Sequence, residues 1–94
     1  CKSKAEKEAS KLLTSSEQGA AISQLKLAKM YAKGEGVPQD NIYAYMWANF
    51  ADSQGLGASA IELKNQLVAQ MTTAEIETAE KLTLECREKS YKDC

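Results

Sequence analysis

Apolar residues recur every three or four positions along most of the chain, a spacing that places them on one face of an α-helix. The first such stretch runs from Lys2 to Leu13 as a narrow stripe of alanines and leucines, and Thr14 to Gly19 is expected to break it. Later stretches run from Ala20 to Lys33, from Ile42 to Gln54 and from Thr73 to about Ser90. The pattern therefore predicts an all-α protein.

A glycine-rich corner separates the second and third of these helices. Gly34 and Gly36 can adopt positive φ at little cost, and Pro38 cannot continue a helix through its own nitrogen. Asp40, like the residue after it, is of the type that caps a helix N-terminus. The helices on either side are therefore expected to fold back on each other as an αα-hairpin.

Two patterns within the hairpin concern its core and its surface. Ala44, Trp47 and Ala51 recur at i, i+3 and i+7, and a large ring beside small residues is typical of closely packed helices, so Trp47 is expected in the core. Tyr45 projects to another side of the same helix. It is the aromatic residue that we expect first at the surface.

A basic strip lies on the remaining face of the helix from Ala20 to Lys33. It consists of Lys26, Lys29 and Lys33 at i, i+3 and i+7. The strip is either a contact for a ligand or a solvated face, and Lys33 also suits the negative end of the helix.

An internal repeat appears about 36 residues along the chain, where Ser53-Gln54-Gly55 resembles Glu17-Gln18-Gly19. A fixed period in this range is typical of helical solenoids. The second copy lacks the glycine-rich corner, and Thr72 with Glu75 instead forms a capping box that begins a helix. We expect this last helix to cover the exposed core of the stack.

Length and charge exclude several classes of protein. The 94 residues are enough for one small domain, and 12 basic against 13 acidic residues give a net charge of −1. This balance offers no electrostatic basis for binding nucleic acid or an anionic membrane surface. No apolar run approaches the roughly 18 residues of a membrane-spanning helix.

The three cysteines give three separate expectations. Cys1 is a candidate for lipidation as in a processed bacterial lipoprotein, or it marks a trimmed chain start. Cys86 and Cys94 favour a local disulfide over a metal site, because the chain has no His, and over a redox pair, because their spacing is not Cys-x-x-Cys. A disulfide would require an oxidising compartment. It would also require the last helix to end near Lys89 or Ser90, since eight helical residues span about 12 Å and a disulfide tolerates at most about 7 Å between Cα atoms.

Catalytic chemistry finds no support in the residue types. Without His there is no imidazole base and no Ser-His or Cys-His pair, and the glutamates lie on predicted polar faces with nothing to raise their pKa. Gly34-Glu35-Gly36 lacks the Lys-Ser/Thr ending of a phosphate-binding loop and follows a helix rather than a strand. We expect no enzymatic activity, no cofactor and no metal.

The corner and its flanking helices resemble the Sel-1-like repeat (SLR) family, a branch of the tetratricopeptide superfamily. The matching letters are Leu27-Ala28, Met30-Tyr31, Gly34-Glu35-Gly36-Val37-Pro38-Gln39-Asp40, Ala44, Trp47, Ala51 and Gln54-Gly55. They cover one near-complete repeat. Two positions depart from the family pattern: Ala28 stands where Gly is frequent, and Asp52 replaces a common Ala, which predicts looser packing or exposure there. The tail from Met71 to Cys94 looks similar to the C-terminal extension of small SLR proteins exported to the periplasm.

The resemblance implies an αα-hairpin solenoid of about one and a half repeats within a single domain. Its expected parts are an N-terminal helix (1–18), an SLR repeat (19–55), a partial second repeat (56–71), and a C-terminal capping helix with its tail (72–94).

The function implied by the resemblance is a non-catalytic protein–protein interaction module or adaptor of the bacterial cell envelope. It would lie in the periplasm, or at the outer membrane if a lipid on Cys1 anchors it. Its partner would bind the groove between helices, with Tyr45, Lys26, Lys29 and Lys33 as candidate contacts. Two alternatives remain open: a structural or assembly protein that self-associates or stacks on other repeat proteins, and an inhibitor of a protein partner.

Overall fold

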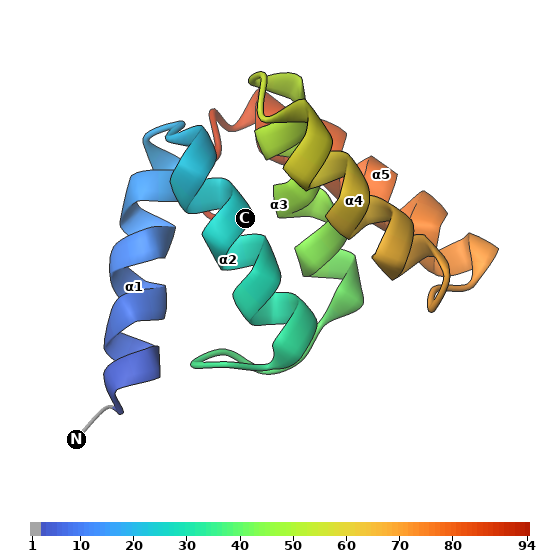
Figure 1. The fold of residues 1–94 in the computed structure, drawn as a ribbon. Helices are drawn as coiled ribbons and strands as arrows, with labels where there is room; N and C mark the ends of the chain where they lie inside the picture. The colour runs from blue at the N-terminus through green and yellow to red at the C-terminus, as the bar shows by residue number, and fades with distance from the viewer. Residues whose placement is uncertain (1–2) are drawn as a thin grey trace.

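Residues 3–94, the part of the chain described by the computed structural model, form five helices and no strand (Figure 1). The helices are α1 (Lys4–Glu17), α2 (Ala21–Lys33), α3 (Asn41–Ser53), α4 (Gly57–Val68) and α5 (Thr73–Glu88). The prediction of an all-α chain built from helical hairpins is confirmed. Cys1, the candidate for lipidation, lies outside the described residues.

The corner between α2 and α3 follows the expected chemistry. Gly34 ends α2 in the left-handed conformation, with φ 73°, and Gly36 has φ 75°. One carboxylate oxygen of Asp40 accepts hydrogen bonds from the backbone N–H groups of Ile42 at 2.9 Å and Tyr43 at 3.1 Å. Asp40 is therefore the N-cap of α3, and the chain reverses as predicted.

Helix α3 is the centre of the molecule. It packs against α2, α4 and α5, while α1 packs on the other side of α2 (Figure 1). Because α3 is covered from three directions, Trp47 is only 1% exposed, and small residues of the same helix are fully buried: Ala44, Ala48 and Ala51. The expected core position of Trp47 is confirmed.

The first helix is longer than the sequence pattern predicts. Instead of breaking at Thr14, α1 continues to Glu17, and the hydroxyl of Thr14 donates a hydrogen bond to the carbonyl of Ser10 one turn earlier. Ser16, which suggested a loop, is fully buried within the helix. Packing of this last turn therefore overrides the low helix propensity of these residues.

The other end of the array also follows specific side chains. Thr72 and Glu75 form the predicted capping box at the start of α5. Asp52, where looser packing or exposure was expected, is half-buried and pairs with Lys64 of α4 at 3.3 Å, which links α3 to α4. Thr83 of α5 accepts a hydrogen bond from Asn49 of α3 at 3.2 Å. Polar pairs thus accompany the apolar contacts that hold α4 and α5 on α3.

Candidate functional site

A groove of about 450 Å³ lies between α2 and α4, with the first residue of α3 at its side. Its walls and floor are formed by Lys29, Ala32, Lys33, Asn41, Ser59, Glu62, Leu63, Gln66, Leu67 and Gln70. Helices α2 and α4 make few direct contacts with each other because both rest on α3. The groove is the space that this arrangement leaves open.

The lining of the groove combines an apolar floor with polar walls. Leu63 and Leu67 are almost completely buried, whereas the charged groups and the glutamine amides around them are exposed at the rim. Lys29 and Lys33 stand on the α2 wall, and Glu62 is the charged residue of the α4 wall. None of these three side chains has a hydrogen-bond or ion-pair partner within residues 3–94. The groove therefore offers unused hydrogen-bonding and charged groups around a small apolar surface.

The structure brings together two of the four predicted contact residues. Lys29 and Lys33 line the groove, while Lys26 is exposed on α2 but outside the lining. The expectation for Tyr45 is wrong: its side chain is only 9% exposed, and Lys64 Nζ lies 5.6 Å from the centre of its ring. Since α3 is covered on three sides, the face that carries Tyr45 is not left to solvent.

The α4 wall was not foreseen from the sequence. Glu62, Gln66 and Gln70 recur every four residues beside the buried Leu63 and Leu67, as on an ordinary solvated helix face. Nothing in this spacing distinguishes a groove wall from such a face. The only usable signal was the strip of lysines on the opposite helix.

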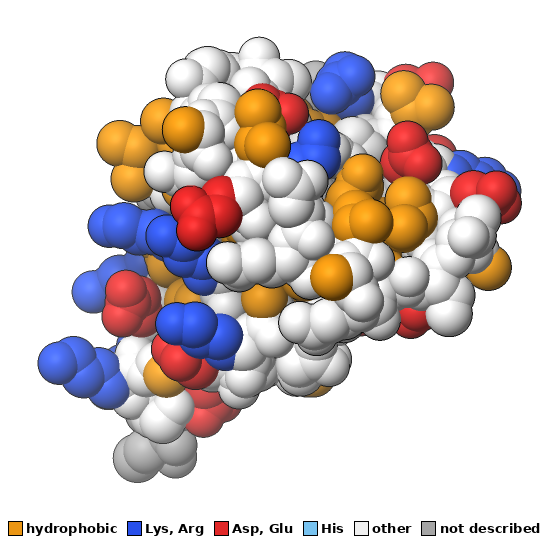
Figure 2. Space-filling model, turned by 45° about the vertical axis from the view of Figure 1, so that its right-hand side comes forward, with side chains coloured by type: hydrophobic (Ala, Val, Ile, Leu, Met, Phe, Trp, Pro, Cys, Tyr) orange, Lys and Arg blue, Asp and Glu red, His pale blue; other side chains and the backbone are white. Residues whose placement is uncertain are grey.

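The face of the molecule in Figure 2 carries small patches of different character. On the face shown in Figure 2, apolar side chains form small patches separated by polar surface, and basic and acidic side chains alternate toward the N-terminal part. No helix within residues 3–94 has the length and apolar character needed to cross a bilayer. The same residues contain no cluster of three or more potential metal ligands.

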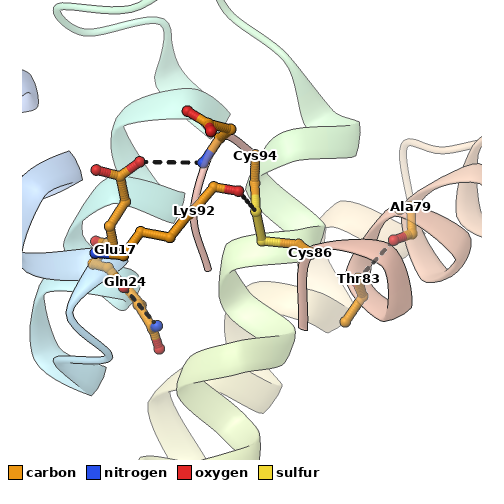
Figure 3. The surroundings of a disulfide bond; sticks show 9 residues. Glu17, Gln24, Ala79, Thr83, Cys86, Lys92 and Cys94 are labelled. Atoms are coloured by element: carbon orange, nitrogen blue, oxygen red, sulfur yellow. Dashed lines mark hydrogen bonds between the residues drawn. A yellow bond between two sulfur atoms is a disulfide. The ribbon is translucent and has the colours of Figure 1, made fainter. Parts of the chain in front are cut away.

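The C-terminal tail folds back after α5, as a Cys86–Cys94 bond requires. The helix ends at Glu88, and the two cysteines form a disulfide with 5.5 Å between their Cα atoms (Figure 3). The N–H of Tyr91 donates to the carbonyl of Cys86 at 3.0 Å, which turns the chain back toward the helix. Left-handed backbone at three positions that are not glycine completes the reversal: Ser90, Tyr91 and Asp93.

The returning tail contacts the beginning of the molecule. The ring of Tyr91 meets Phe50 of α3 edge-to-face, with 4.8 Å between ring centres, and lies against Gly19 in the α1–α2 turn. The N–H of Asp93 donates to a carboxylate oxygen of Glu17 at 3.4 Å, drawn as a dashed line in Figure 3. The disulfide thus keeps the ring of Tyr91 in contact with both α3 and the α1–α2 turn.

A network of hydrogen bonds centred on the buried side chain of Gln24 lies at the same end of the molecule. The side-chain amide of Gln24, which is fully buried, donates to the carbonyl of Ser16 at 3.1 Å and accepts a hydrogen bond from the side chain of Gln54. These contacts link the ends of α1 and α3 through α2. In the sequence, Gln54 belongs to the internal repeat and to the letters that match the SLR family, and nothing there indicates its hydrogen-bond partner.

Tyr31 has the one clearly shifted pKa in residues 3–94. Burial raises the pKa of its hydroxyl, and the nearby Tyr43 and Asp40 raise it further. Its ring stacks on that of Tyr43, with 5.5 Å between ring centres. A raised pKa keeps the hydroxyl of Tyr31 neutral at physiological pH, as suits a half-buried ring in the packing of the corner.

The arrangement of the five helices is shared with a protein of known structure. No protein-family model and no curated protein matches the sequence. Among solved structures, the chain is similar to a protective antigen present in uropathogenic Escherichia coli strains and described as displaying an SLR fold. The match has a TM-score of 0.84 and covers 93% of this chain.

The chain has the SLR fold. Sequence identity to that antigen is 23%, and this chain spans about a fifth of its length, 20%. The resemblance first noted at the corner is therefore confirmed for the fold. Within this SLR fold, α2 and α3 form the hairpin that carries the residues matching the SLR pattern. The groove lies between α2 of this hairpin and the following helix α4.

Proposed function

We propose that this protein is a non-catalytic interaction module whose groove between α2 and α4 binds a segment of a partner protein. One observation carries the proposal: a groove of about 450 Å³ in which the charged and glutamine side chains of the lining have no hydrogen-bond or ion-pair partner within residues 3–94, around an apolar floor. Such a surface suits a peptide that supplies both side chains and backbone hydrogen bonds. The division into N-terminal helix, repeat, partial repeat and cap is part of the same proposal.

The proposed location is the bacterial cell envelope, in an oxidising compartment such as the periplasm. The Cys86–Cys94 disulfide supports this location, because such bonds persist where thiols are not kept reduced. The bacterial source of the solved SLR structure agrees with a bacterial protein. An adaptor in this compartment would act by holding a partner rather than by chemistry.

Filling the groove with a large side chain tests the proposal. Gln66 is exposed and lines the groove, so Gln66→Trp should obstruct it without disturbing the core. Peptides selected from a random library on the wild-type protein are expected to bind this variant at least about tenfold more weakly by titration calorimetry. The matched control is Asn65→Trp, which places the same side chain at the adjacent exposed position outside the lining. Equal binding to both variants would contradict a role for the groove.

A second candidate function is stacking on another copy or on another repeat protein. Two exposed apolar side chains favour it, Ile61 at 47% and Val68 at 41%, which lie seven residues apart on one face of α4 and outside the groove. Sedimentation equilibrium separates the candidates. A mass that rises with concentration and returns to the monomer in Ile61→Glu would favour stacking, whereas a constant monomer mass would favour the adaptor.

A further inference from the structure

Two cations without partners stand on one wall of the groove. Lys29 and Lys33 are one helical turn apart on α2, so their side chains emerge on the same side. Neither has a hydrogen bond or ion pair with any residue from 3 to 94. Among those residues, the lysine that does have a carboxylate partner is Lys64, which pairs with Asp52 outside the groove. The two groove lysines therefore keep their charge free for a ligand.

The opposite wall differs in charge from the α2 wall. Glu62 is its one charged residue, and it lies beyond ion-pair distance from both Lys29 and Lys33. The remaining polar lining on this side consists of the hydroxyl of Ser59 and the amide of Gln66 on α4, and the amide of Gln70 just after the helix. A bound carboxylate would be attracted by the α2 wall and repelled by Glu62. Acidic side chains of a ligand must therefore face α2.

The sign of the lining is opposite to that of the whole chain. Two lysines outweigh one glutamate in the groove, although the chain as a whole carries a net charge of −1. Complementary charge of this kind selects partners and speeds association more than it adds affinity. The apolar floor of Ala32, Leu63 and Leu67 would then contribute the non-specific part of binding.

We propose that the segment bound in the groove is acidic, with carboxylates that face Lys29 and Lys33 and an apolar side chain on the floor between α2 and α4. This inference rests on the proposed function, since it names the chemistry of the partner that the groove accepts.

A selection from a random peptide library displayed on phage tests the charge of the ligand. Four proteins are used: wild type, Gln66→Trp, the Lys29→Glu/Lys33→Glu double variant, and a Lys7→Glu/Lys11→Glu double variant. Lys7 and Lys11 are exposed on α1 at the same spacing and lie outside the groove, so the control changes the charge equally. All substituted sites are exposed, and circular dichroism verifies that each variant is folded.

Peptides selected on the wild type are expected to be enriched in Asp and Glu over Lys and Arg. A synthetic acidic peptide from this set should lose at least about tenfold in affinity for Lys29→Glu/Lys33→Glu and less than about twofold for Lys7→Glu/Lys11→Glu. Its affinity for the wild type should fall as salt concentration rises.

Two other outcomes overturn the inference and separate it from the proposed function. Peptides that Gln66→Trp excludes but that show no acidic enrichment, or that bind Lys29→Glu/Lys33→Glu as well as wild type, would reject the acidic ligand and leave the groove as the binding site. A selection that yields no peptide sensitive to Gln66→Trp would reject both proposals.

Discussion

Replacing Gly36 with alanine is expected to lower the free energy of unfolding by about 2–4 kcal/mol. Gly36 has φ 75°, which a residue with a side chain adopts only at a cost. A Cβ at this position would also overlap the backbone carbonyl of Ala5 in α1. Because backbone atoms cannot rotate away, α1 or the corner would have to move. Urea unfolding followed by the fluorescence of Trp47 measures the loss.

Gly55→Ala is the matched control for this experiment. Gly55 also has positive φ, 102°, but no atom lies within 4 Å of the place where its Cβ would be. This variant should lose only the cost of the left-handed backbone, about 1–2 kcal/mol. If Gly36→Ala costs no more than Gly55→Ala, the close approach of α1 to the corner does not contribute to stability.

Removing the Cys86–Cys94 disulfide is expected to lower the free energy of unfolding by about 2–3 kcal/mol. The bond joins residues eight positions apart, and the loop that it closes limits the freedom of the unfolded chain. Cys94→Ser removes the bond while the buried Cys86 keeps its position in α5. Urea unfolding of this variant, compared with the oxidised wild type, measures the difference.

Tyr91→Ala separates the covalent bond from the contact that it holds. This variant keeps both cysteines but removes the ring that meets Phe50. Reduction should destabilise it by about the same amount as it does the wild type if the loop constraint dominates. Two free thiols at Cys86 and Cys94 in protein purified from an oxidising compartment would contradict the disulfide, as mass measurement before and after alkylation would reveal.

The α2–α3 hairpin was predictable because its signals are local. Gly34 and Asp40 act through their own backbone or the first turn of the next helix, so the sequence contains what the structure uses. The same holds for the capping box of Thr72 and Glu75. Chemistry that spans only a few residues can be predicted without knowledge of the fold.

Errors arose where neighbours in space decide the outcome. Tyr45 is buried because α3 is covered from three directions, and the turn of α1 around Ser16 stays helical because it is packed. For the same reason, only the α2 wall of the groove was predicted. Lys29 and Lys33 were identified as a basic strip, but the α4 wall depends on how α2 and α4 diverge on α3, which no spacing in the sequence encodes.

The contact between the tail and the first turn changes how the molecule can open. In a linear repeat array each element touches only its neighbours, so the end elements can fray independently. Here Asp93 and Glu17 are hydrogen-bonded although they are 76 positions apart in the sequence, and Tyr91 lies against Gly19. The C-terminal tail and the α1–α2 turn are therefore held together. Detachment of α5 and its tail would expose the α1–α2 turn as well, so we expect the chain to unfold as one cooperative unit despite its repeat architecture.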